Sequence, residues 1–273
     1  QRLEPVGDLA EALAARRLGH SGVHVGVFVG LAGGHDGLLP DHALALDLAQ
    51  RICALYDRRL VANINIAATD TQVLVSRGEP GRCLVLFPGT DGWRDAITDL
   101  RAAKAKWEHG RVHAGFRVAY LSCSKSLRAL LPLDEDITIA GHSLGGALAM
   151  LCADDLQMDG YGVGSVYTYG QPRTGNGPFS RSYNRRLGGR TFRCVNQHDP
   201  IPHVPWMLGT YRHAGTEVFL DAAGIHVDRP AWRQIIQPVV DVKDAPSAES
   251  IRWISADAHH ITGYIARLSK STP

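Results

Sequence analysis

One segment constrains the fold more than any other: residues 137–150, ITIAGHSLGGALAM, where a serine lies among glycines. A β-branched run ends at Gly141, and an alanine- and leucine-rich stretch typical of a helix follows. The pattern Gly141-x-Ser143-x-Gly145 between a strand and a helix is the context of a nucleophile elbow. Glycines are needed there because the sharp turn strains the backbone and a neighbouring Cβ would clash. The sequence therefore predicts a strand, a strained turn and a helix, with the Ser143 hydroxyl raised above a sheet.

The surroundings of this serine favour a catalytic role. The N–H of Leu144 would lie at the positive end of the helix, where it can donate to a developing oxyanion. His142 is adjacent in sequence and so points elsewhere; we expect it to support the elbow and not to act as the base. A chance match in an ordinary strand–turn–helix crossover is the alternative, and the correct flanks together with Gly146 argue against it.

Strand-like and helix-like segments alternate from about residue 110 onward. This alternation predicts an α/β fold with a central, mostly parallel sheet and helices on both faces. Upstream, residues 8–18 and 41–58 read as helices, and QVLVS and RCLVLF as a β-hairpin. On the helix after the elbow, Asp154 and Asp155 are expected to face solvent. No composition break divides the chain, which predicts a single domain over residues 1–273.

Composition and charge exclude several functional classes. The formal net charge of +2 is too small to suggest a nucleic-acid partner. No apolar run reaches the roughly 18 residues of a membrane helix, and the N-terminal segment lacks the apolar core of a signal peptide. The chain begins at Gln1, so secretion after signal removal and a cytoplasmic location both stay open. The five cysteines show no metal-like spacing and are expected as buried free thiols; no metal or cofactor is predicted.

Five segments, in the same order, resemble motifs of the fungal-type (class 3) triacylglycerol lipases, a branch of the α/β-hydrolase fold. GHSLGGALA resembles the family's elbow, and LVLFPGTDGWRDAITDL resembles its oxyanion segment. VHAGF resembles its His-x-Gly-Phe, TYGQPRTGN is close to its Tyr-Gly-Gln-Pro-Arg-x-Gly-Asn, and CVNQHDPIPHVP resembles its Asp-Pro-Val-Pro acid loop. The similarity covers about residues 60–268 and implies the α/β-hydrolase fold.

The resemblance also implies the remaining members of a catalytic site. Asp199 matches the family's catalytic acid, and it follows the apolar stretch TFRCVN at a strand end, where α/β active sites gather. His259 and His260 both precede the last helix. His259 is favoured as the base because bacterial relatives commonly place the histidine five residues before a helix tyrosine, here Tyr264. Thr90 matches the family's second oxyanion donor, through its N–H and hydroxyl.

The family has a short amphipathic lid after its oxyanion segment, which here implies Trp93 and Ile97 as apolar lid residues. Three positions depart from the family pattern. Pro88 replaces the usual arginine, Ala96 stands where tryptophan is common, and Ala258 stands where aspartate often precedes the histidine. Trp93 is therefore equally well interpreted as a core residue. Any contact of the protein with a lipid interface would be transient.

The expected activity is hydrolysis of carboxylic esters through an acyl-enzyme, with a triacylglycerol lipase as the leading hypothesis and an ester or lipid as substrate. A soluble short-chain, feruloyl or phospholipid esterase on the same scaffold is the alternative. A non-catalytic hydrolase-fold binding protein is the competing class, because fold does not fix function. The sequence does not determine the oligomeric state.

Overall fold

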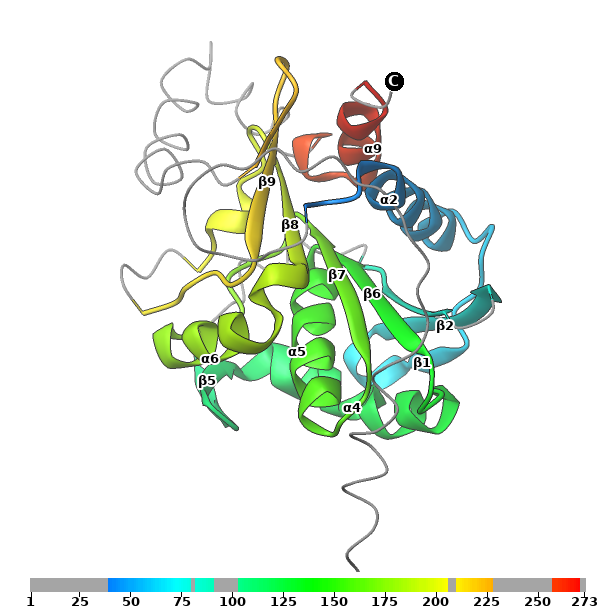
Figure 1. The fold of residues 1–273 in the computed structure, drawn as a ribbon, viewed down its shortest axis with the longest axis vertical. Coiled ribbons are helices and arrows are strands. Elements are labelled where there is room, and N and C mark those ends of the chain that lie inside the picture. Colours follow the sequence, from blue (N-terminus) through cyan, green and yellow to red (C-terminus); the bar gives the residue numbers. More distant parts are fainter. Residues whose placement is uncertain (1–38, 80–81, 91–102, 206–209, 228–256, 271–273) are drawn as a thin grey trace, which may run out of the picture. The chain divides into compact units, whose positions relative to one another are not determined.

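An eight-stranded sheet forms the centre of the fold, with strand order β1-β2-β3-β6-β7-β8-β9-β10 (Figure 1). The computed structural model describes residues 39–79, 82–90, 103–205, 210–227 and 257–270, all of which belong to one compact unit, Asp36–Pro273. The strands are β1 (Ile64–Ile66), β2 (Thr71–Glu79), β3 (Arg82–Phe87), β6 (Asp136–His142), β7 (Val163–Tyr169), β8 (Thr191–Asn196), β9 (Thr216–Leu220) and β10 (Ile225–Val227). β3, β6, β7, β8 and β9 run parallel, and the pairings at both ends of the sheet are antiparallel. The predicted α/β architecture is confirmed, as is the hairpin, formed by β2 and β3.

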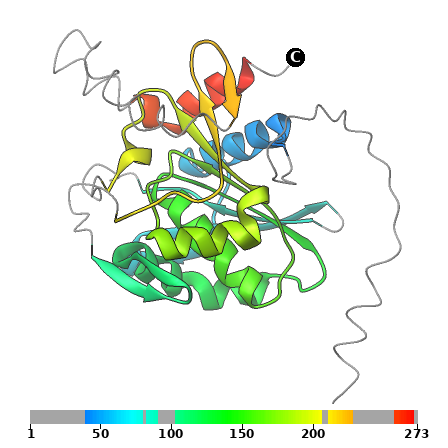
Figure 2. The same ribbon diagram turned by 60° about the vertical axis from the view of Figure 1, so that its left-hand side comes forward.

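Helices cover both faces of this sheet, as the two views agree (Figures 1 and 2). The helices are α2 (His42–Tyr56), α4 (Ala114–Leu130), α5 (Leu144–Met158), α6 (Gly177–Leu187) and α9 (Ile261–Ser269). α2 and α9 share one apolar cluster on one face, while α4, α5 and α6 contribute to the cluster on the other. None of the described helices combines the length and apolar character needed to cross a bilayer.

The central strands are apolar on both sides because each side meets a helical layer. In β3, Val85 and Phe87 belong to the cluster with α4 and α5, whereas Leu86 between them belongs to the cluster with α2 and α9. This near-continuous apolar run is typical of a parallel strand buried on both faces. α5 is buried around most of its circumference, which explains why its first turns contain only glycine and apolar residues.

Some elements differ from the expectations. α6, which begins after the cap residue Asn176, and the hairpin of β4 (Lys104–Trp107) and β5 (Gly110–His113) were not predicted. The expectation that Asp154 faces solvent is wrong. Its carboxylate is fully buried, and it accepts hydrogen bonds from Trp107 Nε1 at 2.8 Å and from Arg186. Asp155 is half-buried, paired with Arg128.

Parts of the predicted organisation fall outside the described residues. The helix expected at residues 8–18 is one of them, so a single domain over residues 1–273 stays a prediction. All five cysteines are free; Cys53 is half-buried and the other four are buried, as expected.

The topology brings the predicted site residues to one edge of the sheet. β6 ends at His142, directly before Ser143, and β8 ends at Asn196, three residues before Asp199. Because the two strands belong to the same parallel stretch, their carboxyl ends meet at one edge, where α/β folds form their sites.

Candidate active site

The elbow at Ser143 has the strained backbone that its glycines predict. Ser143 joins β6 to α5 with φ 56° and ψ −127°, a backbone conformation that residues other than glycine rarely adopt. A Cβ added to Gly141 would lie 2.2 Å from the carbonyl oxygen of Gly145, and a Cβ on Gly145 would lie 2.2 Å from that of Phe87. Both contacts are with backbone, which cannot move aside cheaply. The chain therefore can pass this turn only with glycine at both positions.

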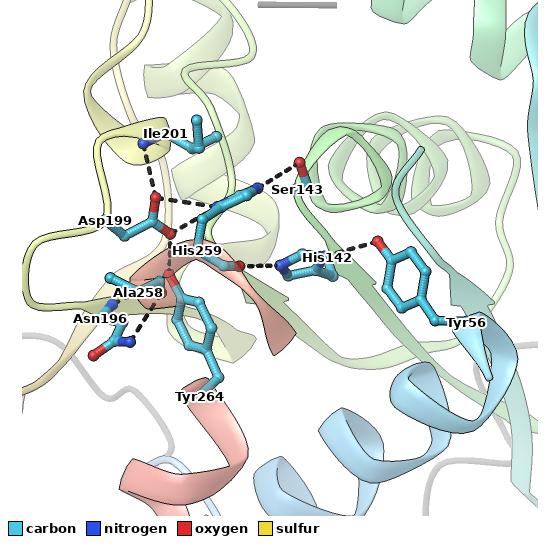
Figure 3. Close-up of polar contacts among 9 residues, drawn as sticks. All are labelled: Tyr56, His142, Ser143, Asn196, Asp199, Ile201, Ala258, His259 and Tyr264. Atoms are coloured by element: carbon cyan, nitrogen blue, oxygen red, sulfur yellow. Dashed lines mark hydrogen bonds and ion pairs between the residues drawn. The ribbon is translucent and has the colours of Figure 1, made fainter. Parts of the chain in front are cut away.

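Three polar side chains from distant parts of the sequence meet at this turn (Figure 3). His259 Nε2 lies 2.8 Å from Ser143 Oγ, and His259 Nδ1 lies 2.9 Å from Asp199 Oδ2 and 3.1 Å from Asp199 Oδ1. All three residues are buried. His260, the other candidate base, is exposed at the N-terminus of α9. The arrangement allows an imidazole to take the serine proton while a carboxylate holds its other nitrogen.

The carboxylate of Asp199 is fixed by two further donors. The Ile201 N–H donates to Oδ1 at 2.8 Å, and the Tyr264 hydroxyl donates to Oδ2 at 2.5 Å. Burial, followed by the charge of Asp199, raises the pKa of Tyr264 well above its usual value, so this hydroxyl keeps its proton. Sequence reasoning used Tyr264 only as a spacing marker and missed this contact; a buried helix tyrosine at a fixed distance from the histidine was the available signal.

Gly170 leaves the room that the Asp–His pair needs. It has a φ of 59°, and a Cβ there would lie 2.7 Å from Asp199 Oδ2 and 2.9 Å from His259 Nδ1. A glycine therefore satisfies both the backbone conformation and the close approach of two polar side chains. This role of the glycine in TYGQPRTGN was not predicted.

The two expected oxyanion donors lie beside the elbow. α5 begins at Leu144, so its N–H belongs to the first helical turn, where amides lack intrahelical acceptors. The hydroxyl of Thr90 is buried, and within the described part of the chain it has no hydrogen-bond partner. Gly89, the preceding residue, is so close to the elbow that an added Cβ would lie 2.9 Å from Ser143 Cβ. Both residues are therefore close to the elbow, as the expected oxyanion donors have to be.

The remaining predictions concern the lid residues and metal binding. Trp93 and Ile97, the suggested lid residues, lie outside the described residues. Within the described ranges, no group of three or more histidine, cysteine, aspartate or glutamate side chains could hold a metal ion.

His142 points away from the serine hydroxyl, into the layer that contains α2 (Figure 3). Its Nε2 lies 2.7 Å from the backbone carbonyl oxygen of His259, and its Nδ1 lies 2.8 Å from the Tyr56 hydroxyl. Burial, followed by the proximity of His259, lowers the pKa of His142 well below the ordinary value of 6.5. The imidazole is therefore neutral at neutral pH and serves as a structural link.

This buried histidine predicts that mild acid destabilises the fold. The unfolded chain binds a proton at residue 142 below about pH 6.5, and the folded protein does not. The stabilising contribution is therefore fully present above this pH and is lost below it, by up to about 1.4 kcal/mol of unfolding free energy per pH unit. Urea unfolding of the wild type and of His142→Gln at about pH 7.5 and 5.5 measures this difference. His260→Gln, which changes an exposed histidine, is the control; an equal pH dependence in wild type and His142→Gln would contradict the assignment.

Comparison with known proteins finds similarity to one family of lipases. The family model described as Lipase (class 3) matches residues 84–208. Among curated proteins, a lipase of Rhizomucor miehei is 32% identical over 182 residues, covering 61% of this chain and 50% of that protein. A secreted mono- and diacylglycerol lipase of Fusarium solani is 32% identical over 123 residues, covering 43% of this chain and 36% of that protein. The chain thus spans about half or less of the length of these two relatives.

Solved structures agree with this assignment. The native propeptide complex of the Rhizomucor miehei lipase matches with a TM-score of 0.58 and 27% identity, covering 67% of this chain and 68% of that one. A structure titled as a triacylglycerol lipase whose catalytic centre is a serine protease triad matches with a TM-score of 0.57 and 25% identity, covering 73% of this chain and 91% of that one. The fold, the elbow and these similarities agree that the chain resembles the class 3 lipases, over residues 84–208 by the family model.

Proposed function

We propose that this protein hydrolyses carboxylic esters through an acyl-enzyme, with Ser143 as nucleophile, His259 as general base and Asp199 as the residue that orients the base. The observation that carries the proposal is the contact of 2.8 Å between Ser143 Oγ and His259 Nε2, at a strained elbow and with His259 Nδ1 on a buried carboxylate. The related proteins are named as lipases, two of them as mono- and diacylglycerol lipases, and these names support an acylglycerol as the substrate.

The chemistry follows from these positions. His259 accepts the hydroxyl proton as Ser143 Oγ attacks the ester carbonyl, and the resulting imidazolium is stabilised by Asp199. The developing oxyanion is met by the N–H of Leu144 and by the N–H and hydroxyl of Thr90, and loss of one such donor costs about 2.7–4 kcal/mol of barrier. His259 then protonates the departing alcohol. Water, activated by the same imidazole, releases the carboxylic acid and restores the serine.

The proposal also includes the class of substrate and the location of the protein. Triacylglycerols or partial acylglycerols are the favoured class, and a phospholipid ester is the second candidate because a rice phospholipase A1 is 34% identical over 134 residues. Two relatives are named as secreted, which supports an extracellular location and transient contact with a lipid interface.

The purified protein tests this proposal with two reagents. A fluorophosphonate probe should form a covalent adduct, and peptide mapping should place the adduct on residue 143. Rates on p-nitrophenyl acetate, butyrate, octanoate and palmitate, and on dispersed trioctanoin and phosphatidylcholine, should rise with acyl length and favour the acylglycerol. An unlabelled protein would rule out the serine hydrolase. A sharp preference for acetyl and butyryl esters would rule out the lipase and leave the soluble esterase.

A further inference from the structure

We propose that Tyr56 and His142 form a positioning relay, which holds the oxyanion segment and the loop of the catalytic base in register with each other. The relay runs from the Gly89 N–H to the Tyr56 hydroxyl. It continues through the His142 imidazole to the backbone carbonyl of His259 (Figure 3). The inference rests on the proposed function, since it assigns a task to residues around the same serine.

The direction of each hydrogen bond is fixed by the last acceptor. The carbonyl oxygen of His259 can only accept, so His142 Nε2 carries the proton that bridges the 2.7 Å between them. In a neutral imidazole the other nitrogen then has a lone pair, and the Tyr56 hydroxyl donates to it across 2.8 Å. The oxygen of Tyr56 in turn accepts from the Gly89 N–H at 2.6 Å. With a neutral His142, these three hydrogen bonds can form together only in this direction.

The two ends of the relay are the two loops whose separation matters for catalysis. Gly89 directly precedes Thr90, the expected oxyanion donor, and follows Pro88, which has no N–H to anchor the segment. His259 precedes α9 and supplies the base. Tyr56 is the last residue of α2, and His142 is the last residue of β6. The relay therefore ties two loops to two rigid elements, as precise active sites require.

A neutral His142 also suits the chemistry of its neighbour. The rings of His142 and His259 lie 4.8 Å apart between centroids. A positive charge on His142 would oppose formation of the imidazolium on His259 when the serine proton is transferred. The donor from Tyr56 and the burial of the ring keep His142 uncharged, so the relay positions the base without weakening it.

The variant Tyr56→Phe tests the relay because it removes one oxygen and keeps the ring. On a water-soluble ester we expect kcat to fall about 10-fold, with KM within about twofold of wild type, since the loss is in positioning and not in substrate binding. Tyr183→Phe is the matched control. This tyrosine of α6 is also fully buried, and its hydroxyl is hydrogen-bonded to Thr191 at 3.0 Å and to no member of the relay. The control should lose stability without a comparable loss of kcat.

A double-mutant cycle separates positioning from general destabilisation. If Tyr56 acts through the oxyanion segment, its replacement should cost clearly less in a Thr90→Val background than in wild type. Additive effects, or a Tyr56→Phe enzyme with kcat within twofold of wild type, would overturn the relay. If the wild-type protein is labelled at Ser143 and Tyr56→Phe keeps its full kcat, only the relay is contradicted. If the wild-type protein is not labelled, the proposed function itself is contradicted.

A measurement on the unmodified protein covers the case in which Tyr56→Phe does not fold. ¹⁵N NMR of the histidine rings should show His142 protonated at Nε2 and unprotonated at Nδ1, unchanged from about pH 6 to 9. A proton on Nδ1, or an imidazolium at neutral pH, is incompatible with the bond directions above and would overturn the relay.

Discussion

Ser143→Ala is expected to lower kcat by about 10⁶-fold, because the hydroxyl that would carry the acyl group is gone and the remaining groups act as a unit with it. The Cβ and the backbone stay as they are, so folding should be little affected. Hydrolysis of p-nitrophenyl octanoate and labelling by a fluorophosphonate probe give the two readouts, and both should disappear.

A companion variant links the same residue to the strain in the elbow. Ser143→Gly should be as inactive as Ser143→Ala but more stable by about 1 kcal/mol, since relief of the positive φ is worth more than the added entropy of the unfolded chain. Urea unfolding of both variants measures the difference. Substantial activity in either variant would show that another group is the nucleophile, and a less stable glycine variant would show that the turn is not strained.

The elbow could be predicted from sequence because its requirements are local. A strand, a helix and the glycines between them all lie within a few residues of Ser143, and the clashes that exclude a side chain at Gly141 and Gly145 are with neighbouring backbone. The alternation of apolar strands and helices likewise predicted a parallel sheet. A strand that is buried on both faces is a near-continuous run of apolar residues, which can be recognised in each strand separately.

The failures have a common, non-local cause. Asp154 was expected in solvent, yet its partners are Trp107 on β4 and Arg186 on α6. Both elements were missing from the sequence interpretation, so nothing in the local pattern of α5 could reveal that this carboxylate is covered. α6 itself is rich in polar residues, and the side chain of Asn176, which accepts from the Phe179 N–H, is the signal that marks its start.

The same limit applies to the site. The roles of Tyr264 and Gly170 depend on contacts with Asp199 and His259, across a large separation in sequence. Motif similarity proposed the acid and the base, but neither periodicity nor spacing could decide how their neighbours hold them.

His259→Gln is expected to lower kcat by a similar factor, about 10⁶-fold, because glutamine cannot accept the serine proton or carry the charge that Asp199 stabilises. The neighbouring His260→Gln is the matched control, since the same chemical change one residue away alters only an exposed side chain. Its kcat should stay within twofold of wild type. The comparison uses one water-soluble ester at saturating concentration, with thermal unfolding of each variant to exclude misfolding.

The pair of variants decides between the two adjacent histidines. If His260 were the base, the effects would be reversed, and the contact between His259 Nε2 and Ser143 Oγ at 2.8 Å would be structural only. Added imidazole sharpens the result: in His259→Gly the vacated space next to the serine should admit imidazole and recover part of the activity, whereas His260→Gly should not respond. Recovery in the second variant alone would contradict the proposed base, because an exogenous ring can restore proton transfer only where the native ring performed it.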